Sequence, residues 1–220
     1  GYSDMRTYSV GFSGIDEQAC NELSLARAVA KKWGTRHTEI IVESQRIIND
    51  LEHMVEHLDE PYGGGIPSWY VYELVGQHEK VCLTGTGADE LFTNYGKYNI
   101  FEKSLFYRSV RSLRNALRLN SIQEIINGIK YPQGNFYHQY FSDAYKDKFF
   151  VPALRKSTAS LIQQTWQDAS TTDPRDAVAY VDFNMQLPEE FLMVTDRFSM
   201  AHSVEARVPF LDHTVVESVF

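Results

Sequence analysis

The protein has 220 residues and a mass of 25.3 kDa, which is enough for one large domain or two small ones with a buried core. Hydrophobic residues make up 43% and aromatic residues 13% of the sequence, a composition that excludes an intrinsically disordered chain. The formal net charge of −8 disfavours nucleic acid and anionic membranes as partners, so an anionic ligand requires a local site or a metal ion. The sequence has two cysteines, no apolar run of 18 residues and no apolar N-terminal signal, from which we expect a cytoplasmic protein.

The first hundred residues alternate strand and helix patterns. Residues 7–12 (TYSVGF) are rich in β-branched and aromatic side chains and predict a strand. Asp16 is a suitable cap for the helix that follows, and Gly34 is a suitable stop. The apolar residues that predict this helix recur at three- and four-residue steps: Cys20, Leu23, Ala26, Ala30 and Trp33.

A second round of the same alternation follows. Residues 37–42 (HTEIIV) predict a strand and residues 44–58 a helix. After a glycine-containing loop at residues 62–67, residues 80–84 (KVCLT) predict a third strand. This alternation predicts right-handed crossovers and a parallel sheet covered by helices on both faces. From about residue 96 onward helical patterns predominate, and we expect this half to share one core with the α/β half.

The most informative stretch is LTGTGADELFTNY at residues 83–95. After the third strand, Gly85 and Gly87 mark a turn, and such a turn between a strand and a helix is typical of sites where free backbone N–H groups bind phosphate. Asp89 and Glu90 repel bare phosphate, so a nucleotide bound here requires a Mg²⁺ ion between its phosphates and these carboxylates. Alternatively, the two acidic residues merely complement the helix dipole. The predicted buried face of the helix consists of Ala88, Leu91, Phe92 and Tyr95.

Three other patterns have simpler explanations. Ser13-Gly14-Ile15-Asp16 is similar to a pyrophosphate-binding loop but lacks its second glycine and final serine, so we interpret Asp16 as a helix cap. His53 and His57 fit the H-x-x-E-H pattern of zinc peptidases, but they lie opposite the apolar arc of their helix and are expected to face solvent. Four arginines share one side of a predicted helix and are interpreted as a solvated face: Arg108, Arg111, Arg114 and Arg118.

The last informative block is DRFSMAHSVEARVPFLDH at residues 196–213. Because Val208 and Pro209 follow Arg207, the segment is predicted to be extended there. Glu205 and Arg207 then point the same way, and a charged pair that fixes the segment explains both residues.

Five segments occur in the order found in one protein family. They are TYSVGF, ARAVAKKWGTRHTEI, LDEP at residues 58–61, KVCLTGTGADELF and DRFSMAHSVEARVPFLDH. With them the chain resembles, over nearly its whole length, the synthetase domain of glutamine-dependent asparagine synthetases, a family that includes β-lactam and carbapenam synthetases. The resemblance implies an α/β fold with a parallel sheet, of the ATP-pyrophosphatase (adenine nucleotide alpha hydrolase-like) type. Residues 1–95 would form its nucleotide-binding part and residues 96–220 a largely helical part.

The resemblance also implies a reaction that uses ATP and Mg²⁺. An acceptor carboxylate attacks the α-phosphorus of ATP, pyrophosphate leaves, and ammonia displaces AMP; with aspartate as the acceptor, the product is asparagine. Asp89 is similar in position to the family's ligand of metal and pyrophosphate, and Glu90 beside it is a second candidate metal ligand. Val10 matches the position that contacts adenine. The turn residues expected to bind the nucleotide are Thr84, Gly85 and Gly87.

The sequence departs from the family at a position tied to catalysis. Thr86 lies between the two glycines, where the family's asparagine synthetases usually have glutamate, and threonine cannot act as a base at neutral pH. Together with the glycines at residues 63–65, this leaves three alternatives open: an aspartate-dependent enzyme, the same chemistry on a sugar acid or peptide carboxylate, or a noncatalytic nucleotide-binding module. Arg36, Arg197 and Arg207 are candidates for pairing with a substrate carboxylate.

Other parts of the family's machinery fall outside the 220 residues. The pyrophosphate loop is expected before Gly1, the catalytic lysine after Phe220, and the partner that supplies ammonia is a separate glutaminase domain. We therefore expect a piece of a longer protein that forms no AMP by itself. The sequence leaves the oligomeric state open, and a homodimer is compatible with it.

Overall fold

The structure is a computed structural model, and it divides into two compact units. It describes residues 4–13, 22–60, 62, 64–95, 146, 148–149, 151, 157–171 and 174–219. The first unit comprises Gly1–Gly87 and Pro188–Ser218 with Phe220, and the second comprises Ala88–Leu187 with Val219. Two of the motifs considered above, the Gly14–Asp16 part of the degraded loop and the four arginines at 108–118, lie outside the described residues.

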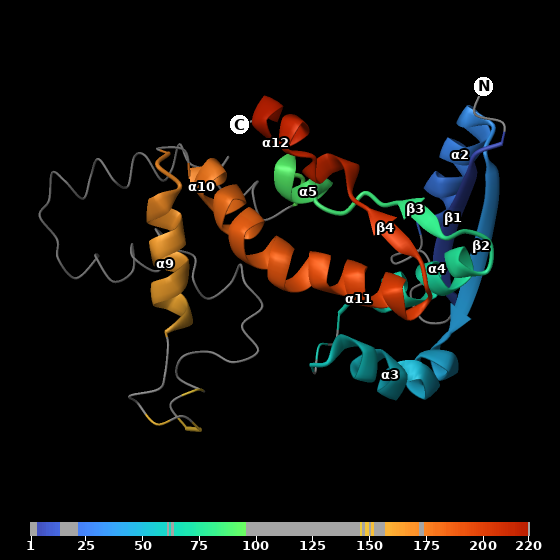
Figure 1. The fold of residues 1–220 in the computed structure, drawn as a ribbon, viewed down its shortest axis with the longest axis horizontal. Coiled ribbons are helices and arrows are strands. Elements are labelled where there is room, and N and C mark those ends of the chain that lie inside the picture. The colour runs from blue at the N-terminus through green and yellow to red at the C-terminus, as the bar shows by residue number, and fades with distance from the viewer. Residues whose placement is uncertain are drawn as a thin grey trace, which may run out of the picture. The chain divides into compact units, whose positions relative to one another are not determined.

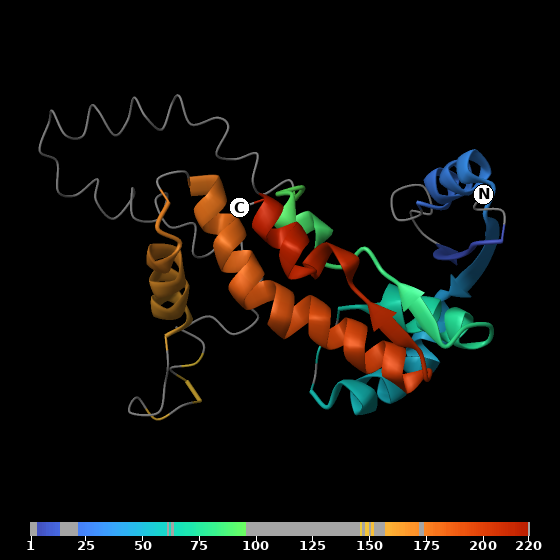
Figure 2. The same cartoon turned by 45° about the horizontal axis from the view of Figure 1, so that its top comes forward.

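The first unit begins with a parallel pair of strands. β1 (Arg6–Ser13) and β2 (Arg36–Glu43) pair in parallel, with Val10 opposite Ile40. The connecting helix α2 (Leu23–Trp33) contacts both strands, as Figures 1 and 2 show. α2 ends as predicted, because Gly34 adopts the left-handed conformation with φ of 68°.

Two helices follow β2. α3 (Ser44–Leu58) has the predicted bounds. α4 (Ile66–Gly76) begins inside the segment 62–67 that the sequence predicted as loop. The difference has a local cause: Gly65 caps the helix with φ of 76°, and a proline is compatible with the first helical turn, where its missing N–H is not needed.

A second parallel pair joins segments far apart in the sequence. β3 (Val81–Leu83) pairs with β4 (Glu205–Arg207), so the extended segment predicted around Arg207 is confirmed. This pairing was not predicted, because no local sequence feature identifies the partner strand. Among the described residues the four strands form two separate parallel pairs, where the sequence predicted one parallel sheet.

The core of the first unit lies where its helices meet. α11 (Met193–Ala201) contacts both α3 and α4. The Trp69 ring packs edge-on against Phe198 and His202, with centroids 5.2 and 4.5 Å apart. Side chains of β1 to β4 pack against the same cluster, which therefore joins helices and strands. Its buried members are Val42, Met54, Leu58, Trp69, Tyr70, Tyr72, Val75, Val194, Phe198 and Val204.

The second unit is helical where it is described. The helices that lie wholly in it are α5 (Ala88–Leu91), α9 (Thr158–Asp168) and α10 (Pro174–Val181). Val178 and Ala179 form its buried cluster, against which Tyr95 and Trp166 pack. This agrees with the helical patterns expected beyond residue 96.

The helix predicted after Gly87 is shorter than expected. It ends at Leu91, and Phe92 is 51% exposed, so the prediction that Phe92 belongs to a buried face was wrong. Thr93 has a φ of 52°, and the N–H of Asn94 bonds back to the carbonyl of Asp89, which turns the chain out of the helix.

The remaining elements lie near the C-terminus. A π-helical segment (Asp182–Leu192) continues α10 and leads into α11, and it contains Pro188, whose missing N–H disfavours regular α-helical bonding. A short 3₁₀ turn (Pro209–Leu211) and α12 (His213–Val219) follow β4. Within the described part of the chain, no helix is both long and apolar enough to cross a membrane.

Candidate functional site

The turn at Thr84–Gly87 continues directly from β3. The N–H of Thr84 donates to the carbonyl of Arg207 at 2.9 Å and so extends the β3–β4 ladder by one bond. Gly85 is exposed, and a Cβ placed on it would have no atom within 4 Å. Gly87 is buried, has a φ of 90°, and lies so close to Leu211 that a Cβ there would clash. Gly85 thus leaves its backbone open to a ligand, whereas packing explains why Gly87 is glycine.

Thr86 is surrounded by other hydroxyl groups. Its Oγ1 lies 3.0 Å from Oγ1 of Thr84 and 3.2 Å from Oγ1 of Thr195 on α11, and its N–H donates to Thr84 Oγ1 at 3.4 Å. Burial raises the pKa of the Tyr72 phenol, and hydrogen bonding to Thr84 and Thr195 offsets part of that rise. We call Tyr72, Thr84, Thr86 and Thr195 the hydroxyl cluster.

The hydroxyl cluster includes two residues that the sequence did not single out, Tyr72 and Thr195. Thr195 is 109 residues from Thr86 in the chain, and Tyr72 belongs to a helix in which most residues are apolar or aromatic. No local motif connects them with the turn. A uniformly apolar helix such as α4 indicates burial, and that is the only signal the sequence offered for Tyr72.

Val10, the expected adenine contact, lies on β1 and is half-buried. It packs against the same core cluster as Cys82 of β3, two residues before Thr84. The structure therefore places Val10 and the turn in one unit. A role for either in nucleotide binding stays a prediction.

Asp89 and Glu90, the expected metal ligands, belong to the second unit. The Glu90 carboxylate is buried and accepts a short hydrogen bond from the hydroxyl of Tyr95. Burial, together with Glu90, raises the pKa of Tyr95. Asp89 is only half-buried, and its Oδ1 accepts a 2.9 Å hydrogen bond from the Asn94 amide. The two neighbours thus differ. The Glu90 carboxylate is engaged inside its unit with Tyr95, whereas only one of the two carboxylate oxygens of Asp89 takes part in the bond with Asn94.

Asp89 fits the way proteins hold Mg²⁺. This ion usually keeps several waters and is bound through one or two carboxylates together with substrate phosphates. A helix of four residues adds little dipole, so Asp89 is not explained by helix stabilisation alone. Among the residues that the structure describes, no group of three or more His, Cys, Asp or Glu could hold a metal. The donor set suits an ion shared with phosphate, not a cage made by protein alone.

The three candidate arginines each have a partner nearby. Arg36 donates to Asp4 at 2.7 Å, and both side chains are exposed. Arg197 donates to the carbonyl of Leu58 at the end of α3. The expected charged pair of Glu205 and Arg207 is confirmed: Nε of Arg207 lies 2.9 Å from Oε1 of Glu205. Each of the three arginines thus has a partner within the protein, and whether any of them binds a substrate carboxylate stays a prediction.

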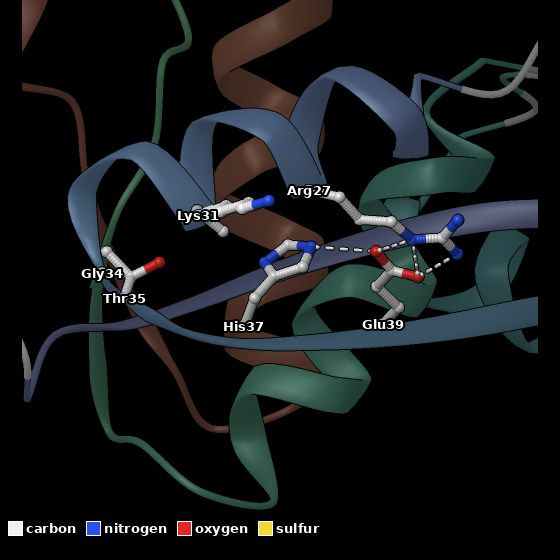
Figure 3. A pocket seen from close by; sticks show the side chains of 7 residues that line it. Arg27, Lys31, Gly34, Thr35, His37 and Glu39 are labelled. Atoms are coloured by element: carbon white, nitrogen blue, oxygen red, sulfur yellow. Dashed lines mark hydrogen bonds and ion pairs between the residues drawn. The ribbon is translucent and has the colours of Figure 1, made fainter.

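A pocket of about 560 Å³ lies elsewhere in the first unit, on α2 and β2 (Figure 3). Arg27 donates to both carboxylate oxygens of Glu39 at 2.6 to 3.1 Å, and Nε2 of His37 lies 3.2 Å from Glu39. This arrangement lowers the pKa of Glu39, chiefly through the hydrogen bonds from Arg27. None of the predicted site residues lines the pocket. The lining residues are Arg27, Ala30, Lys31, Gly34, Thr35, His37 and Glu39.

His53 and His57, which fit the zinc-peptidase pattern, are exposed on α3 as predicted. Their rings lie 5.7 Å apart, next to the ring of Trp69, and Nδ1 of His53 is 3.0 Å from the Glu56 carboxylate. Because no group of three or more His, Cys, Asp or Glu within the described ranges could hold a metal ion, the structure gives no support to a zinc peptidase.

Comparison with known proteins decides the family. A family model described as asparagine synthase matches residues 2–220. The chain belongs to the asparagine synthase family. It is 26% identical over 242 residues to asparagine synthetase (glutamine-hydrolyzing) 1 of Bacillus subtilis (strain 168), covering 98% of this chain and 36% of that protein. It is 24% identical over 234 residues to asparagine synthetase (glutamine-hydrolyzing) 3 of the same organism, covering 100% of this chain and 34% of that protein.

The asparagine synthase match bears on the predictions from the sequence. It confirms the resemblance seen in the sequence and an α/β chain with parallel strands and mostly helical content. The chain spans about a third of the length of these curated relatives.

Proposed function

We propose that the chain is the ATP-using part of a ligase that adenylates a carboxylate and transfers ammonia to it. Aspartate is the first candidate acceptor, with asparagine, AMP and pyrophosphate as products. In the whole protein, glutamine would supply the ammonia through a glutaminase domain, as the names of the two relatives indicate for those proteins.

The observation that carries this proposal is the open turn at Thr84–Gly87. It lies at the carboxyl end of a parallel strand, the usual position of a ligand site in α/β proteins. The backbone at Gly85 faces free space, so its polar groups are accessible to a nucleotide. Gly87 makes the sharp change of direction possible, and Leu211 packs behind it.

Each proposed site residue has a distinct task. Thr84 and Gly85 would contact the nucleotide at the turn, and Val10 would contact the adenine ring through its half-buried side chain. Asp89, held by Asn94, would hold Mg²⁺ bound to the phosphates. When bound, Mg²⁺ would neutralise the charge that develops on the leaving pyrophosphate. Glu90 would support this segment through Tyr95 instead of binding metal.

One observation favours a second candidate, the same chemistry on a carboxylate other than aspartate. Thr86 lies where the family's asparagine synthetases usually have glutamate, and its side-chain partners in the hydroxyl cluster are hydroxyls too. A hydroxyl cluster provides hydrogen bonds but no base at neutral pH. An acceptor whose reaction needs orientation more than proton removal suits this site better.

The test is pyrophosphate–ATP isotope exchange with the intact protein, first with aspartate and then with a panel of sugar acids and peptide carboxylates. Exchange that requires aspartate supports the first candidate, and exchange with another acid supports the second. If Mg-ATP binds but no acid supports exchange, both are refuted in favour of a noncatalytic nucleotide-binding module. In that case Thr86→Glu becomes the informative variant, because gain of exchange would show that only the base had been lost.

The 220-residue chain by itself provides a second test. Because it spans about a third of its relatives, we expect it to lack groups that bind phosphate and stabilise the transition state. No AMP formation is expected from this chain with ATP, ammonia and the accepted acid. Steady AMP release would contradict that expectation.

A further inference from the structure

The hydroxyl cluster connects the middle of the turn, at Thr86, to the buried helix α11, whereas β4 holds one end of the turn at Thr84 and Leu211 packs against its other end at Gly87. Thr86 lies between Gly85 and Gly87, and a Cβ placed on Gly85 would have no atom within 4 Å. Of the side-chain partners described for Thr86, Thr84 is local, so it cannot anchor the turn to the rest of the unit. Thr195 can, because it belongs to α11.

Thr195 is fixed by its surroundings. It is only 7% exposed, and its neighbours on α11, Val194 and Phe198, are 4% and 1% exposed. Gly65 approaches Val194 so closely that a Cβ there would clash with it. A helix packed at this density moves little, so its hydroxyl is a fixed reference point for the turn.

Tyr72 completes the arrangement from α4. Its side chain is 4% exposed, and burial keeps the phenol protonated well above neutral pH. All four members of the hydroxyl cluster are therefore uncharged at neutral pH. Each has one proton to donate and can accept in return, so the cluster can hold Thr86 in one orientation with no ionisable group.

We propose that Thr195 is a positioning residue for the reaction: its hydroxyl holds Thr86, and thereby the Thr84–Gly87 turn, in the geometry that the adenylation step requires. This inference rests on the proposed function. It goes beyond it in assigning a role to a residue on α11 that no motif indicates. Its alternative is that Thr195 only fills space in the core.

Isosteric variants separate these two roles. Thr195→Val keeps the volume and removes the hydroxyl, whereas Thr195→Ser keeps the hydroxyl. Ser199→Ala is the matched control, because Ser199 is also buried on α11 but its hydroxyl donates to the carbonyl of Asp196 within the helix.

The primary measurement is pyrophosphate–ATP exchange by the intact protein with the acid it accepts. Thr195→Val is expected to lower kcat about 3- to 10-fold, the value of one hydrogen bond, with KM for ATP nearly unchanged. Thr195→Ser is expected to restore kcat, and Ser199→Ala to leave it unchanged. Thr86→Val combined with Thr195→Val is expected to be no slower than Thr86→Val alone, because both remove the same interaction. Additive losses, or equal losses in Thr195→Val and Ser199→Ala, would overturn the inference.

A second measurement does not depend on activity. Amide hydrogen exchange of the intact protein, read on peptides that contain residues 83–87, is expected to be faster in Thr195→Val than in wild type and unchanged in Ser199→Ala. If the wild type supports no exchange of pyrophosphate, the proposed function fails, and this measurement alone decides whether Thr195 holds the turn. Unchanged protection in Thr195→Val, or faster amide exchange with unaltered kcat, would overturn the positioning role.

Discussion

Two regions of the first unit hold their polar side chains in opposite ways. In the pocket on α2 and β2, Arg27 and Glu39 form a charged pair in which the arginine is 62% exposed. In the hydroxyl cluster, Tyr72 and Thr195 are buried and uncharged, and both come from core helices. The pocket has the cavity and the charges, whereas the hydroxyl cluster includes the turn that we propose as the nucleotide site.

The difference supports placing the proposed site at the turn and not in the pocket. Water screens an exposed ion pair, and the charges of Arg27 and Glu39 already satisfy each other, so little remains for a ligand. A buried hydroxyl cannot exchange its partner for water without cost, so it fixes geometry. A group that must hold a fixed geometry is therefore better placed next to the core than in an exposed, charged pocket.

The largest effect on stability is expected from a substitution at Gly87, in the turn. Gly87→Ala is expected to destabilise the folded protein by about 3 kcal/mol, because the added methyl group meets Leu211 and the positive φ is strained. Urea unfolding followed by circular dichroism measures this loss.

Gly85→Ala is the matched control for that variant. Its added methyl group meets open space, so stability is expected to change by no more than about 0.5 kcal/mol. Mg-ATP binding, measured by calorimetry on the intact protein, is nevertheless expected to weaken, because the methyl group would lie where we propose that the nucleotide binds. Equal stability losses in the two variants would contradict the distinct roles given to the glycines.

Asp89 and Glu90 extend the comparison to the second unit. Asp89→Asn is expected to slow pyrophosphate exchange by about 100-fold and to raise the Mg²⁺ concentration it requires, because it removes the charged ligand. Glu90→Gln is expected to leave the Mg²⁺ requirement unchanged and to lower stability instead, since it weakens the bond with Tyr95. A shared Mg²⁺ effect in both variants would restore Glu90 as a metal ligand.

A smaller, pH-dependent effect is expected from His202, which packs on Trp69 in the core. Burial lowers the pKa of His202 below its ordinary value of 6.5; the nearby His57 also lowers it, and Glu73 opposes the change. The folded state therefore favours the neutral ring. Unfolding free energy is expected to be highest above pH 6.5 and to decrease as the pH falls through the lowered pKa.

The control for His202 is an exposed histidine. His202→Gln is expected to remove part of this pH dependence in urea unfolding, whereas substitution of His213, which is 79% exposed, by Gln is expected to retain it. A pH dependence that is lost equally in both variants would show that His202 is not its source.

The smallest effect is expected in the pocket. Arg27→Gln is expected to leave the rate of pyrophosphate exchange within about twofold of wild type, because the site that we propose lies at the Thr84–Gly87 turn and none of its residues lines the pocket. Arg27 lowers the pKa of Glu39 below its ordinary value of 4.5, so the stabilisation exists above that pH and is lost as pH falls through the lowered value. Arg27→Gln should therefore reduce acid sensitivity in unfolding titrations, and less so in high salt. A large loss of exchange would make the pocket part of the site.

Several elements followed from local sequence. The bounds of α3 and the stop of α2 at Gly34 were predicted correctly, because apolar periodicity and a glycine in the left-handed conformation are local properties. The strand before Gly85 and the extended segment at Arg207 were also predicted, since β-branched residues and a following proline restrict the backbone directly. Residues 88–95 were less predictable: the apolar spacing continued through Phe92, but Thr93 and Asn94 turned the chain away.

The sequence by itself determined the family, the helix and strand patterns, and the candidate turn, because each depends on residues that are neighbours in the chain. Only the tertiary structure decided that β3 pairs with β4, that Glu90 is engaged with Tyr95, that Thr195 meets Thr86, and that Tyr72 interacts with Thr84 and Thr195. These contacts join residues whose approach depends on how helices pack, and packing is a collective property of the core that no single segment specifies.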